Sequence, residues 1–359
     1  MIQYSSDYWK DVNRVTELIP NVKQLFSKRI MITGGTGMIC SAVAEILFCL
    51  NHERNANIDI LLAGRSRNRM MERFYCFSEG RDYSFVEYDA TKNQELSQCT
   101  DYIIHGASNA NPLIYTAQPV ETMLANFLGL NNLLEMGVKT GSKRLLYVSS
   151  SEVYGNKTGN QPYKEKDYGY VDILNQRACY PSAKRAAETL CTAYGQEYGL
   201  DTVIVRPGHI YGPTITETDS RASAQFTQNA IEGEDIVMKS AGMQMRSYCY
   251  VLDCASAILT VLLNGKSGDA YNISNKASVC TISDIALALA HAGGQKVVYE
   301  NATDEEKKGY NLMSNSSLDA AKLEKLGWRA CFDLEEGAEA TVKYMKIGNC
   351  ETRDARSQT

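Results

Sequence analysis

Short apolar runs alternate with amphipathic stretches from residue 29 onward. The runs have the length and composition of buried strands, and the stretches between them have helical periodicity, most clearly at about 42–50, 120–138 and 181–198. Strands that alternate with helices form βαβ units, which build a parallel sheet covered by helices on both faces. The pattern therefore predicts an α/β fold with a doubly wound parallel sheet. The six expected strands are Arg29–Ile32, Ile58–Ala63, Ser84–Tyr88, Asp101–Ile104, Arg144–Val148 and Thr202–Val205.

The pattern changes at three places, which divide the chain into four parts. Residues 1–28 form a prefix in which Ser5 can cap a helix, and we expect this helical extension to cover the main domain or to contact another subunit. The sheet domain is expected at 29–213, and a smaller α/β lobe at 214–346, although elements of the sheet can return within it. The tail 347–359 is polar and is predicted to be disordered. The apolar face expected for the prefix helix consists of Trp9, Val12, Val15, Leu18 and Ile19.

Composition narrows the possible functions of this 359-residue chain. A formal net charge of −5 argues against a nucleic-acid partner, which usually meets a basic surface. No apolar run approaches the ~18 residues that a membrane helix needs, and the first residues lack the continuous apolar core of a signal peptide, so we expect a cytoplasmic protein without a membrane contact. The eleven cysteines include no C-x-x-C pair and the four histidines lie far apart, so we expect reduced thiols and no metal site.

A glycine-rich turn, Thr33–Cys40, follows the first expected strand and precedes the first expected helix. Gly34 and Gly37 allow a tight turn, and the backbone N–H groups at the helix N-terminus, here at Met38 and Ile39, can bind a pyrophosphate. Such a turn can be a simple connection, but its place between a strand and a helix favours dinucleotide binding. At its end a cysteine stands where a third glycine is usual, which predicts slightly looser packing of the helix against the strand.

The ends of the second and third expected strands bear on the choice of cofactor. An acidic residue usually ends the second strand and binds the ribose hydroxyls of NAD, but here the strand ends at Gly64. The guanidinium groups of Arg65 and Arg67 can bind a 2′-phosphate, which slightly favours NADP over NAD, unless they belong to a solvated loop. Asp89 follows the third strand, where its carboxylate can reach the adenine amino group or serve as a turn residue.

A tyrosine and a lysine one helical turn apart, Tyr180 and Lys184, are the first candidates for catalysis. An ammonium group beside a phenol favours the phenolate and lowers the pKa of the phenol, as a base that deprotonates an alcohol requires. Ser150 follows the fifth expected strand, and its hydroxyl can hydrogen-bond the same substrate oxygen. The Y-x-x-x-K spacing alone is common by chance, so the serine strengthens the assignment.

These features, in this order and spacing, resemble the extended short-chain dehydrogenase/reductase family of NAD(P)-dependent nucleotide-sugar epimerases, dehydratases and decarboxylases. The resemblance covers about residues 29–346 and includes His105–Ser108, Asn126-x-x-Gly129, Arg206–Pro213 and Val251-x-Asp253. It implies a Rossmann-type NAD(P)-binding domain, a C-terminal lobe that binds the nucleotide sugar, and a homodimer built from helices. It further implies that Ala107, Asn126, Pro207 and the Tyr180–Lys184 pair contact the cofactor, and that the substrate contacts are Ser108, Tyr115, Ser151, His209, Arg221 and Arg246.

Within this family, Ser150-Ser151-Glu152 is the informative triplet. The hexose 4,6-dehydratases typically carry an aspartate before the glutamate, and 4-epimerases usually lack the glutamate, whereas the UDP-glucuronate decarboxylases carry Ser-Glu. The resemblance is closest to this last branch, also around Arg177–Tyr180. It implies oxidation of the sugar C4 hydroxyl to a 4-ketone, decarboxylation of a UDP-glucuronate-like substrate, and Glu152 as a further catalytic residue.

Alternatives to this reaction stay open. A hexose substrate would instead undergo 4,6-dehydration or 4-epimerisation, and a protein of another class, a non-catalytic NADP-binding sensor, would use the same fold. Such sensors generally lose the tyrosine or the lysine, and both are present here. His209 stands where the family usually has an asparagine, so it is a catalytic acid or, as we favour, a binding or packing residue.

Overall fold

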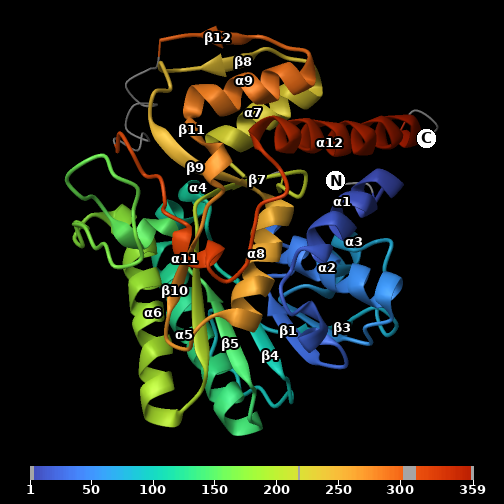
Figure 1. The fold of residues 1–359 in the computed structure, drawn as a ribbon, viewed down its shortest axis with the longest axis vertical. Coiled ribbons are helices and arrows are strands. Elements are labelled where there is room, and N and C mark those ends of the chain that lie inside the picture. The colour runs from blue at the N-terminus through green and yellow to red at the C-terminus, as the bar shows by residue number, and fades with distance from the viewer. Residues whose placement is uncertain (1–3, 217–218, 302–312, 357–359) are drawn as a thin grey trace.

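The computed structural model describes residues 4–216, 219–301 and 313–356, and a seven-stranded sheet lies at its centre (Figure 1). All neighbouring strands run parallel, in the order β10-β6-β5-β4-β1-β2-β3. The predicted α/β fold with a doubly wound parallel sheet is confirmed, and all six expected strands are present. The strands are β1 (Arg29–Thr33), β2 (Asp59–Gly64), β3 (Ser84–Glu87), β4 (Tyr102–His105), β5 (Arg144–Val148), β6 (Thr202–Pro207) and β10 (Ala270–Ile273).

Helices cover both faces of this sheet. The helices of the large domain are α1 (Ser6–Glu17), α2 (Met38–Arg54), α3 (Arg67–Arg73), α4 (Pro112–Ala117), α5 (Pro119–Thr140), α6 (Cys179–Tyr198) and α8 (Val251–Asn264), with 3₁₀ turns η1 (Val22–Leu25), η2 (Ser151–Tyr154) and η3 (Gln176–Ala178); of these, α1 and α4 pack on other helices. Ile30 and Ile32 of β1 belong to the apolar core shared with α2 and α8, whereas Met31 between them belongs to the core shared with α5 and α6. Because successive side chains of a strand point to opposite faces, both faces of β1 are buried.

The sheet has a point at which the strand order reverses. The chain adds β2 and β3 on one side of β1, and β4, β5 and β6 on the other. In sheets of this kind a crevice opens at the carboxyl ends of the two strands where the order reverses, here β1 and β4. The seventh strand, β10, begins more than sixty residues after β6 ends. It pairs with β6, so that Ile273 lies beside Pro207. The sheet therefore extends beyond residue 213.

A smaller lobe lies beyond the carboxyl ends of the strands, at the top of Figure 1. Its elements are β7 (His209–Tyr211), α7 (Ala222–Glu232), β8 (Ile236–Met238), β9 (Met245–Tyr250), η4 (Lys276–Ser278), β11 (Val279–Thr281), α9 (Ile282–Gly293), β12 (Val297–Tyr299) and α12 (Leu334–Arg356). The strands form a three-stranded sheet, β11-β9-β7, and a pair, β12-β8. Helix α9 packs against α7 and α12, whereas the short helix α11 (Ala321–Glu324) packs on β10 of the large sheet.

The N-terminal extension docks on the large domain through α1, which packs on α2 and α8. Ser5 caps the helix as predicted, because its side chain accepts a hydrogen bond from the N–H of Tyr8. Val15 is buried, but Leu18 is 49% exposed, although it was expected on the same apolar face. The helix ends at Glu17, one residue before Leu18, so the helical spacing no longer applies there.

A buried carboxylate fixes this extension to two helices of the large domain. Glu45 on α2 is fully buried and accepts hydrogen bonds from the hydroxyls of Tyr8 (2.5 Å) and Tyr4 (2.9 Å). Arg73 on α3 pairs with the same carboxylate at 2.6 Å. A buried charge is tolerated only when it is paired and hydrogen-bonded. The extension therefore connects α2 and α3. It covers the main domain, which was expected as one alternative to a contact with another subunit.

Helix α12 runs to Arg356. It packs against α9 and α7, with Ala338 and Val342 buried. The predicted disorder of the tail from residue 347 stays a prediction. Residues 357–359 of the predicted tail lie outside the described residues.

Helix α5 presents apolar side chains to solvent on the face away from the sheet. The most exposed are Val120 (68%), Met123 (45%), Leu124 (42%) and Phe127 (47%). A homodimer built from helices would cover such a face, and this homodimer stays a prediction. Within the described ranges, no helix combines the length and the apolar character that a membrane span requires.

Cys40 packs directly on Gly106, which begins the loop after β4. Cys40 is only 3% exposed, and a Cβ added to Gly106 would overlap its sulfur. The other two nearest atoms, of Thr33 and Val148, would lie at ordinary contact distances of 3.5 and 3.7 Å. The thiol thus fills the space that a side chain at position 106 would take. The expected looser packing of the helix against the strand stays a prediction.

We predict that Gly106→Ala destabilises the protein by about 1–3 kcal/mol, because the added methyl overlaps the Cys40 sulfur. Cys40→Ala removes that sulfur, so the double variant should be more stable than the sum of the two single effects by about 1–3 kcal/mol. Urea unfolding of the wild type, both single variants and the double variant measures this coupling. Additive effects would contradict the contact.

Candidate active site

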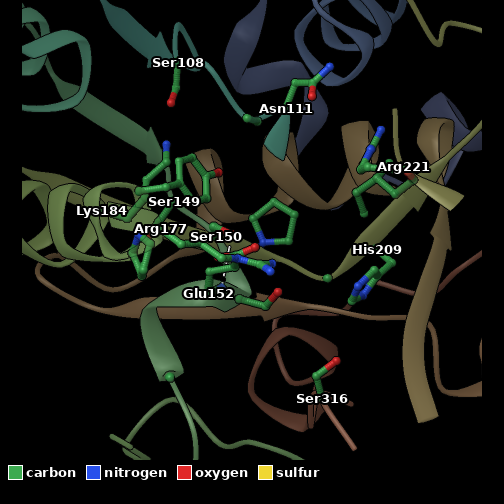
Figure 2. Close-up of a pocket in the computed structure, with 18 of the residues that line it drawn as sticks. Ser108, Asn111, Ser149, Ser150, Glu152, Arg177, Lys184, His209, Arg221 and Ser316 are labelled. Carbon is green, nitrogen blue, oxygen red and sulfur yellow. Dashed lines mark hydrogen bonds between the residues drawn. The ribbon is translucent and has the colours of Figure 1, made fainter. Parts of the chain in front are cut away.

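A cavity of about 880 Å³ lies at the carboxyl ends of the strands, under the smaller lobe (Figure 2). The large domain contributes the N-terminus of α2, the segments after β4, β5 and β6, and the start of α6. The lobe side contributes Arg221 and the segment 313–316. The cavity lies where the strand order reverses, which is the expected place for a ligand in a sheet of this type.

The glycine turn shapes the end of the cavity at α2. Gly34 has φ = +72°, a left-handed conformation that suits glycine, and its carbonyl accepts a hydrogen bond from the N–H of Gly37 at 2.9 Å. Gly37 is the N-cap residue of the 17-residue helix α2 and provides no side-chain cap, and Met38 and Ile39 in the first turn line the cavity. Uncapped N–H groups at a helix N-terminus attract anions. The residues present therefore fit the diphosphate of a dinucleotide.

The residues predicted at the adenosine end lie outside this cavity. Arg65 is exposed at the end of β2, and Arg67 pairs with Glu79. Asp89 accepts hydrogen bonds from the backbone N–H and the hydroxyl of Thr91, at 3.1 and 2.8 Å. Its carboxylate thus stabilises its own turn, and its predicted contact with the adenine stays a prediction.

Three other residues implied to contact the cofactor have different surroundings. Pro207 lines the cavity. Ala107 does not, and its N–H donates to the hydroxyl of Thr33 at 3.2 Å. Asn126 is fully buried behind the sheet's carboxyl edge, where its amide oxygen accepts a hydrogen bond from the hydroxyl of Tyr147 at 3.1 Å. The structure thus assigns Asn126 to the interior rather than to the cavity wall, because its side chain is used within the core.

Ser150, Tyr180 and Lys184 come together on the cavity wall formed by the end of β5 and the start of α6 (Figure 2). The ammonium of Lys184 donates to the carbonyl of Val148 at 2.8 Å and lies 5.7 Å from the centre of the Tyr180 ring. Ser150 hydrogen-bonds the Tyr180 hydroxyl. The predicted trio therefore shares one site, with the serine rather than the lysine in contact with the phenol.

Burial dominates the ionisation of these groups. Desolvation raises the pKa of Tyr180 above its ordinary value, the charge of Glu152 raises it further, and the hydrogen bond from Ser150 is the largest effect that lowers it. Desolvation also lowers the pKa of Lys184 to about 7. Lys184 therefore changes its charge near neutral pH, which is where a group that takes part in proton transfer is most useful.

Tyr115 supports the ring of Tyr180. Its ring stacks on that of Tyr180 with the centres 5.1 Å apart and an angle of 11° between the planes. Tyr115 is 1% exposed and does not line the cavity, whereas its neighbour Ile114 does. The stacking fixes the plane of the phenol, and the predicted substrate contact of Tyr115 stays a prediction.

A buried polar network lies behind the trio. The carboxylate of Glu188 on α6 accepts a hydrogen bond from Ser149 (2.6 Å) and two from Arg206 on β6 (2.9 and 2.6 Å). Arg206 also donates to the hydroxyl of Tyr154 (3.0 Å), which donates to the side chain of Asn272 on β10 (2.5 Å). Helix α6, turn η2 and three strands are thus held in one arrangement.

Glu152 enters the cavity from η2 (Figure 2). Burial raises the pKa of Glu152 above its ordinary value, and the charge of nearby Arg177 only partly offsets this effect. A carboxyl group with a raised pKa can hold or transfer a proton closer to neutral pH. Ser151, which precedes it, also lines the cavity, as expected.

Three side chains present unpartnered polar atoms on the cavity wall (Figure 2). The hydroxyls of Ser108 and Ser316 and the Nδ1 atom of His209 are buried, and none has a hydrogen-bond partner among the described residues. Buried polar atoms are normally hydrogen-bonded, so these atoms mark places for a ligand. Desolvation lowers the pKa of His209 to about 3, helped by the charges of Arg246 and Arg221. A neutral imidazole suits binding rather than the role of a catalytic acid.

The two predicted arginines differ in their surroundings. Arg221 lines the cavity and pairs with the carboxylate of Asp219 at 2.9 Å. Arg246 is 3% exposed and does not line the cavity, and its Nη1 donates to the carbonyls of Met245 (2.8 Å) and Met313 (3.0 Å). Arg246 lies within β9 and holds the start of the segment 313–316, and its predicted substrate contact stays a prediction.

Two residues of the site were missed. Arg177 lines the cavity one helical turn before Tyr180, and this spacing is a signal that could have identified it. Ser316 lies in the polar run Ser314–Ser317, which has no motif of its own. Only the fold brings that run to the cavity, more than a hundred residues after the trio.

We predict that Lys184→Met abolishes turnover but, near pH 7, raises the melting temperature of the ligand-free protein. In the folded protein desolvation lowers the pKa of this lysine from 10.5 to about 7. The unfolded chain holds the extra proton between these pH values, so the wild type becomes more stable as pH rises through this range, and a methionine has no such dependence. Melting curves of both proteins measure the difference. A difference that does not shrink with rising pH would contradict the assignment.

Comparisons with known proteins agree with this geometry. The model of a family described as "NAD dependent epimerase/dehydratase family" matches residues 30–274. A curated relative, UDP-glucuronic acid decarboxylase 1 of Xenopus tropicalis, is 31% identical over 336 residues, which make up 92% of this chain and 76% of the relative. The match thus includes the glycine turn, the trio and most of the smaller lobe.

Solved structures show the same fold. UDP-glucose 4-epimerase of Thermotoga maritima, in complex with UDP-glucose, has a TM-score of 0.75 at 23% identity, over 89% of this chain and 99% of that one. A dTDP-glucose 4,6-dehydratase of Bacillus anthracis, in complex with NAD, has a TM-score of 0.71 at 21% identity, over 89% and 97%. Together with the family match and the 31% identity above, the site shows that this chain belongs to the NAD-dependent epimerase/dehydratase family of extended short-chain dehydrogenases/reductases, a family of enzymes.

Proposed function

We propose that the protein oxidises the C4 hydroxyl of a nucleotide-linked hexuronate and then removes its carboxylate as carbon dioxide, as in the UDP-glucuronate decarboxylases that it resembles. The observation that carries this proposal is the position of Glu152, an acid of raised pKa, in the same cavity as the Ser150–Tyr180–Lys184 trio. The 31% identity with a UDP-glucuronic acid decarboxylase supports it.

The trio is suited to the oxidation step. Tyr180 takes the proton of the C4 hydroxyl, and Ser150, which contacts the Tyr180 hydroxyl, holds the same oxygen in place. The ammonium form of Lys184 stabilises the phenolate that this step requires. The nicotinamide ring of the bound cofactor supplies the hydride acceptor for this step and the hydride donor at the end.

The 4-ketone makes decarboxylation possible because it lies β to the C6 carboxylate. The C5–C6 bond breaks, its electron pair passes into the enolate of the ketone, and carbon dioxide leaves. A proton then goes to C5, and Glu152 is placed to deliver it because burial raises its pKa. The ketone is finally reduced at C4, so the reaction releases one carbon dioxide, takes up one proton and leaves the cofactor unchanged.

Product masses test this proposal. Incubation with a panel of nucleotide-linked uronic acids and hexoses, UDP-glucuronate and UDP-glucose among them, should give loss of carbon dioxide from a uronic acid. Tyr180→Phe should lower turnover by about 100-fold or more, because only the phenolic oxygen acts as the base, and cofactor binding should persist. Loss of water from a hexose would indicate a 4,6-dehydratase, and an isomer of unchanged mass a 4-epimerase. Absence of turnover with the whole panel would indicate a non-catalytic sensor.

We also propose a slight preference for NADP over NAD. Gly64 ends β2 without a carboxylate, and Arg65 beside it is exposed, whereas Arg67 is paired with Glu79. Calorimetric titration should therefore show tighter binding of NADP. Arg65→Gln should abolish the preference, because it removes the exposed guanidinium expected to contact the 2′-phosphate, while the matched control Arg67→Gln leaves it unchanged. Tighter binding of NAD by the wild type would refute this preference.

A further inference from the structure

Helix α1 of the N-terminal extension lies beside α12 of the smaller lobe, and long side chains join the two helices (Figure 1). The hydroxyl of Tyr344 on α12 donates to the carboxylate of Asp11 on α1 at 2.5 Å. The ring of Tyr344, which is 3% exposed, meets the ring of Tyr8 edge to face with the centres 5.2 Å apart. Aromatic pairs of this geometry and hydrogen bonds to a carboxylate both stabilise a contact. The two helices are thus joined at a defined place.

A second contact joins α1 to the segment that leads into α12. Arg14 donates to the carbonyl of Cys331 at 2.7 Å, and its guanidinium lies 4.9 Å from the centre of the Phe332 ring. The backbone N–H groups of Cys331 and Phe332 donate to the buried carboxylate of Asp253 on α8, at 2.7 and 3.1 Å. The entrance to α12 is therefore held by two helices of the large domain, α1 and α8.

The same helix is fixed to α2, whose N-terminus faces the cavity. Tyr8 is fully buried, and its hydroxyl donates to Glu45 of α2 at 2.5 Å while its ring contacts Tyr344 of α12. One side chain of the extension thus touches a helix of the large domain and a helix of the lobe. Helix α1 therefore connects the two parts of the molecule between which the cavity lies.

Helix α12 supports the lobe side of the cavity wall through β7 and α7. A Cβ added to Gly337 of α12 would overlap the hydroxyl of Tyr211, and this hydroxyl donates to the carbonyl of Leu334 at 3.3 Å. Tyr211 ends β7, which begins at His209 on the cavity wall. Helix α12 also packs on α7, which begins directly after Arg221, another wall residue. Because protein interiors are close-packed, a displacement of α12 displaces this wall.

We infer that α1 is a strap that fixes the smaller lobe relative to the large domain, and that Asp11 and Tyr344 are positioning residues for the nucleotide sugar. The glycine turn and the trio belong to the large domain alone, whereas the lobe supplies His209, Arg221 and the segment 313–316. Releasing the strap should therefore weaken nucleotide-sugar binding but not cofactor binding. The inference rests on the nucleotide-sugar substrate of the proposed function and not on its decarboxylation.

Two substitutions test this inference. Tyr344→Phe removes the donor of the hydrogen bond between α12 and α1, and Asp11→Ala removes its acceptor. Each should raise the Kd of UDP-glucuronate, measured by calorimetry with the cofactor bound, by about 3- to 30-fold, as expected for a change transmitted through packing. The Kd of the cofactor alone should change by less than about two-fold. The double variant should bind no more weakly than the weaker single variant, because both substitutions remove the same contact.

Turnover gives a readout that a general loss of structure would not reproduce. The effect should appear in KM, with kcat changed by less than about two-fold, because Tyr180 and Lys184 lie on α6 of the large domain. Glu17→Ala is the matched control, since it also removes a carboxylate from α1, but this carboxylate pairs with Arg54 of α2 at 3.6 Å. All constants of this control should equal those of the wild type.

Hydrogen exchange tests the strap without a ligand. In Tyr344→Phe, and in Arg14→Gln, which removes the second contact, the amides of α12 should exchange faster than in the wild type, while those of β1 and β5 exchange as before. Unchanged exchange in α12 together with an unchanged Kd of UDP-glucuronate would overturn the inference. Equal losses of nucleotide-sugar and cofactor binding would overturn it as well, because they would indicate general destabilisation.

The inference and the proposed function can fail separately. If the wild type binds UDP-glucuronate but releases no carbon dioxide, the decarboxylation fails and the strap is still tested by the Kd values. If the wild type releases carbon dioxide and both strap variants bind UDP-glucuronate as the wild type does, the proposed function stands and the inference fails. If the wild type binds no nucleotide sugar of the panel, both fail.

Discussion

The ion pair between Glu188 and Arg206 is the interaction on which the catalytic wall depends. It joins α6 to β6 inside the core, and Ser149 at the end of β5 donates to the same carboxylate. Removing one partner of such a pair leaves an uncompensated buried charge, at a cost of about 3–5 kcal/mol, so α6 cannot slide along the sheet. Lys184 and Tyr180 precede Glu188 on this helix by one and two turns, so the pair fixes both against β5.

The same ion pair sets the electrostatic balance of the site. Glu188 raises the pKa of Lys184, but desolvation outweighs it and brings that pKa to about 7. Because Glu188 shares its negative charge with Arg206 in a bidentate contact, it cannot hold Lys184 fully charged. The lysine is therefore able to change its protonation state as charge develops on Tyr180.

Much of the fold and the centre of the site could be predicted because the signals are local. The alternation of strands and helices, the glycine turn, and the four-residue spacing of Tyr180 and Lys184 all lie within single elements or adjacent ones. The side chains of Arg246, Asn126 and Tyr115 do not line the cavity, and a sequence pattern cannot predict this because side-chain direction decides it. A shift of one residue in a strand turns a side chain to the opposite face, and Arg246 lies inside β9.

The remaining site residues depend on contacts that no local pattern records. Whether Arg177 has a carboxylate partner, and whether the hydroxyl of Ser316 has any partner, is decided by segments far away in the chain. Ser316 comes from a segment far from the trio in the sequence, whereas Arg177 lies in η3, which leads directly into α6 and Tyr180. The buried ion pair holds α6 against β6, so it also fixes the start of the helix at which Arg177 and Tyr180 lie close together. A change at Arg177 therefore acts next to the base, whereas a change at Ser316 acts on the opposite side of the cavity, away from α6.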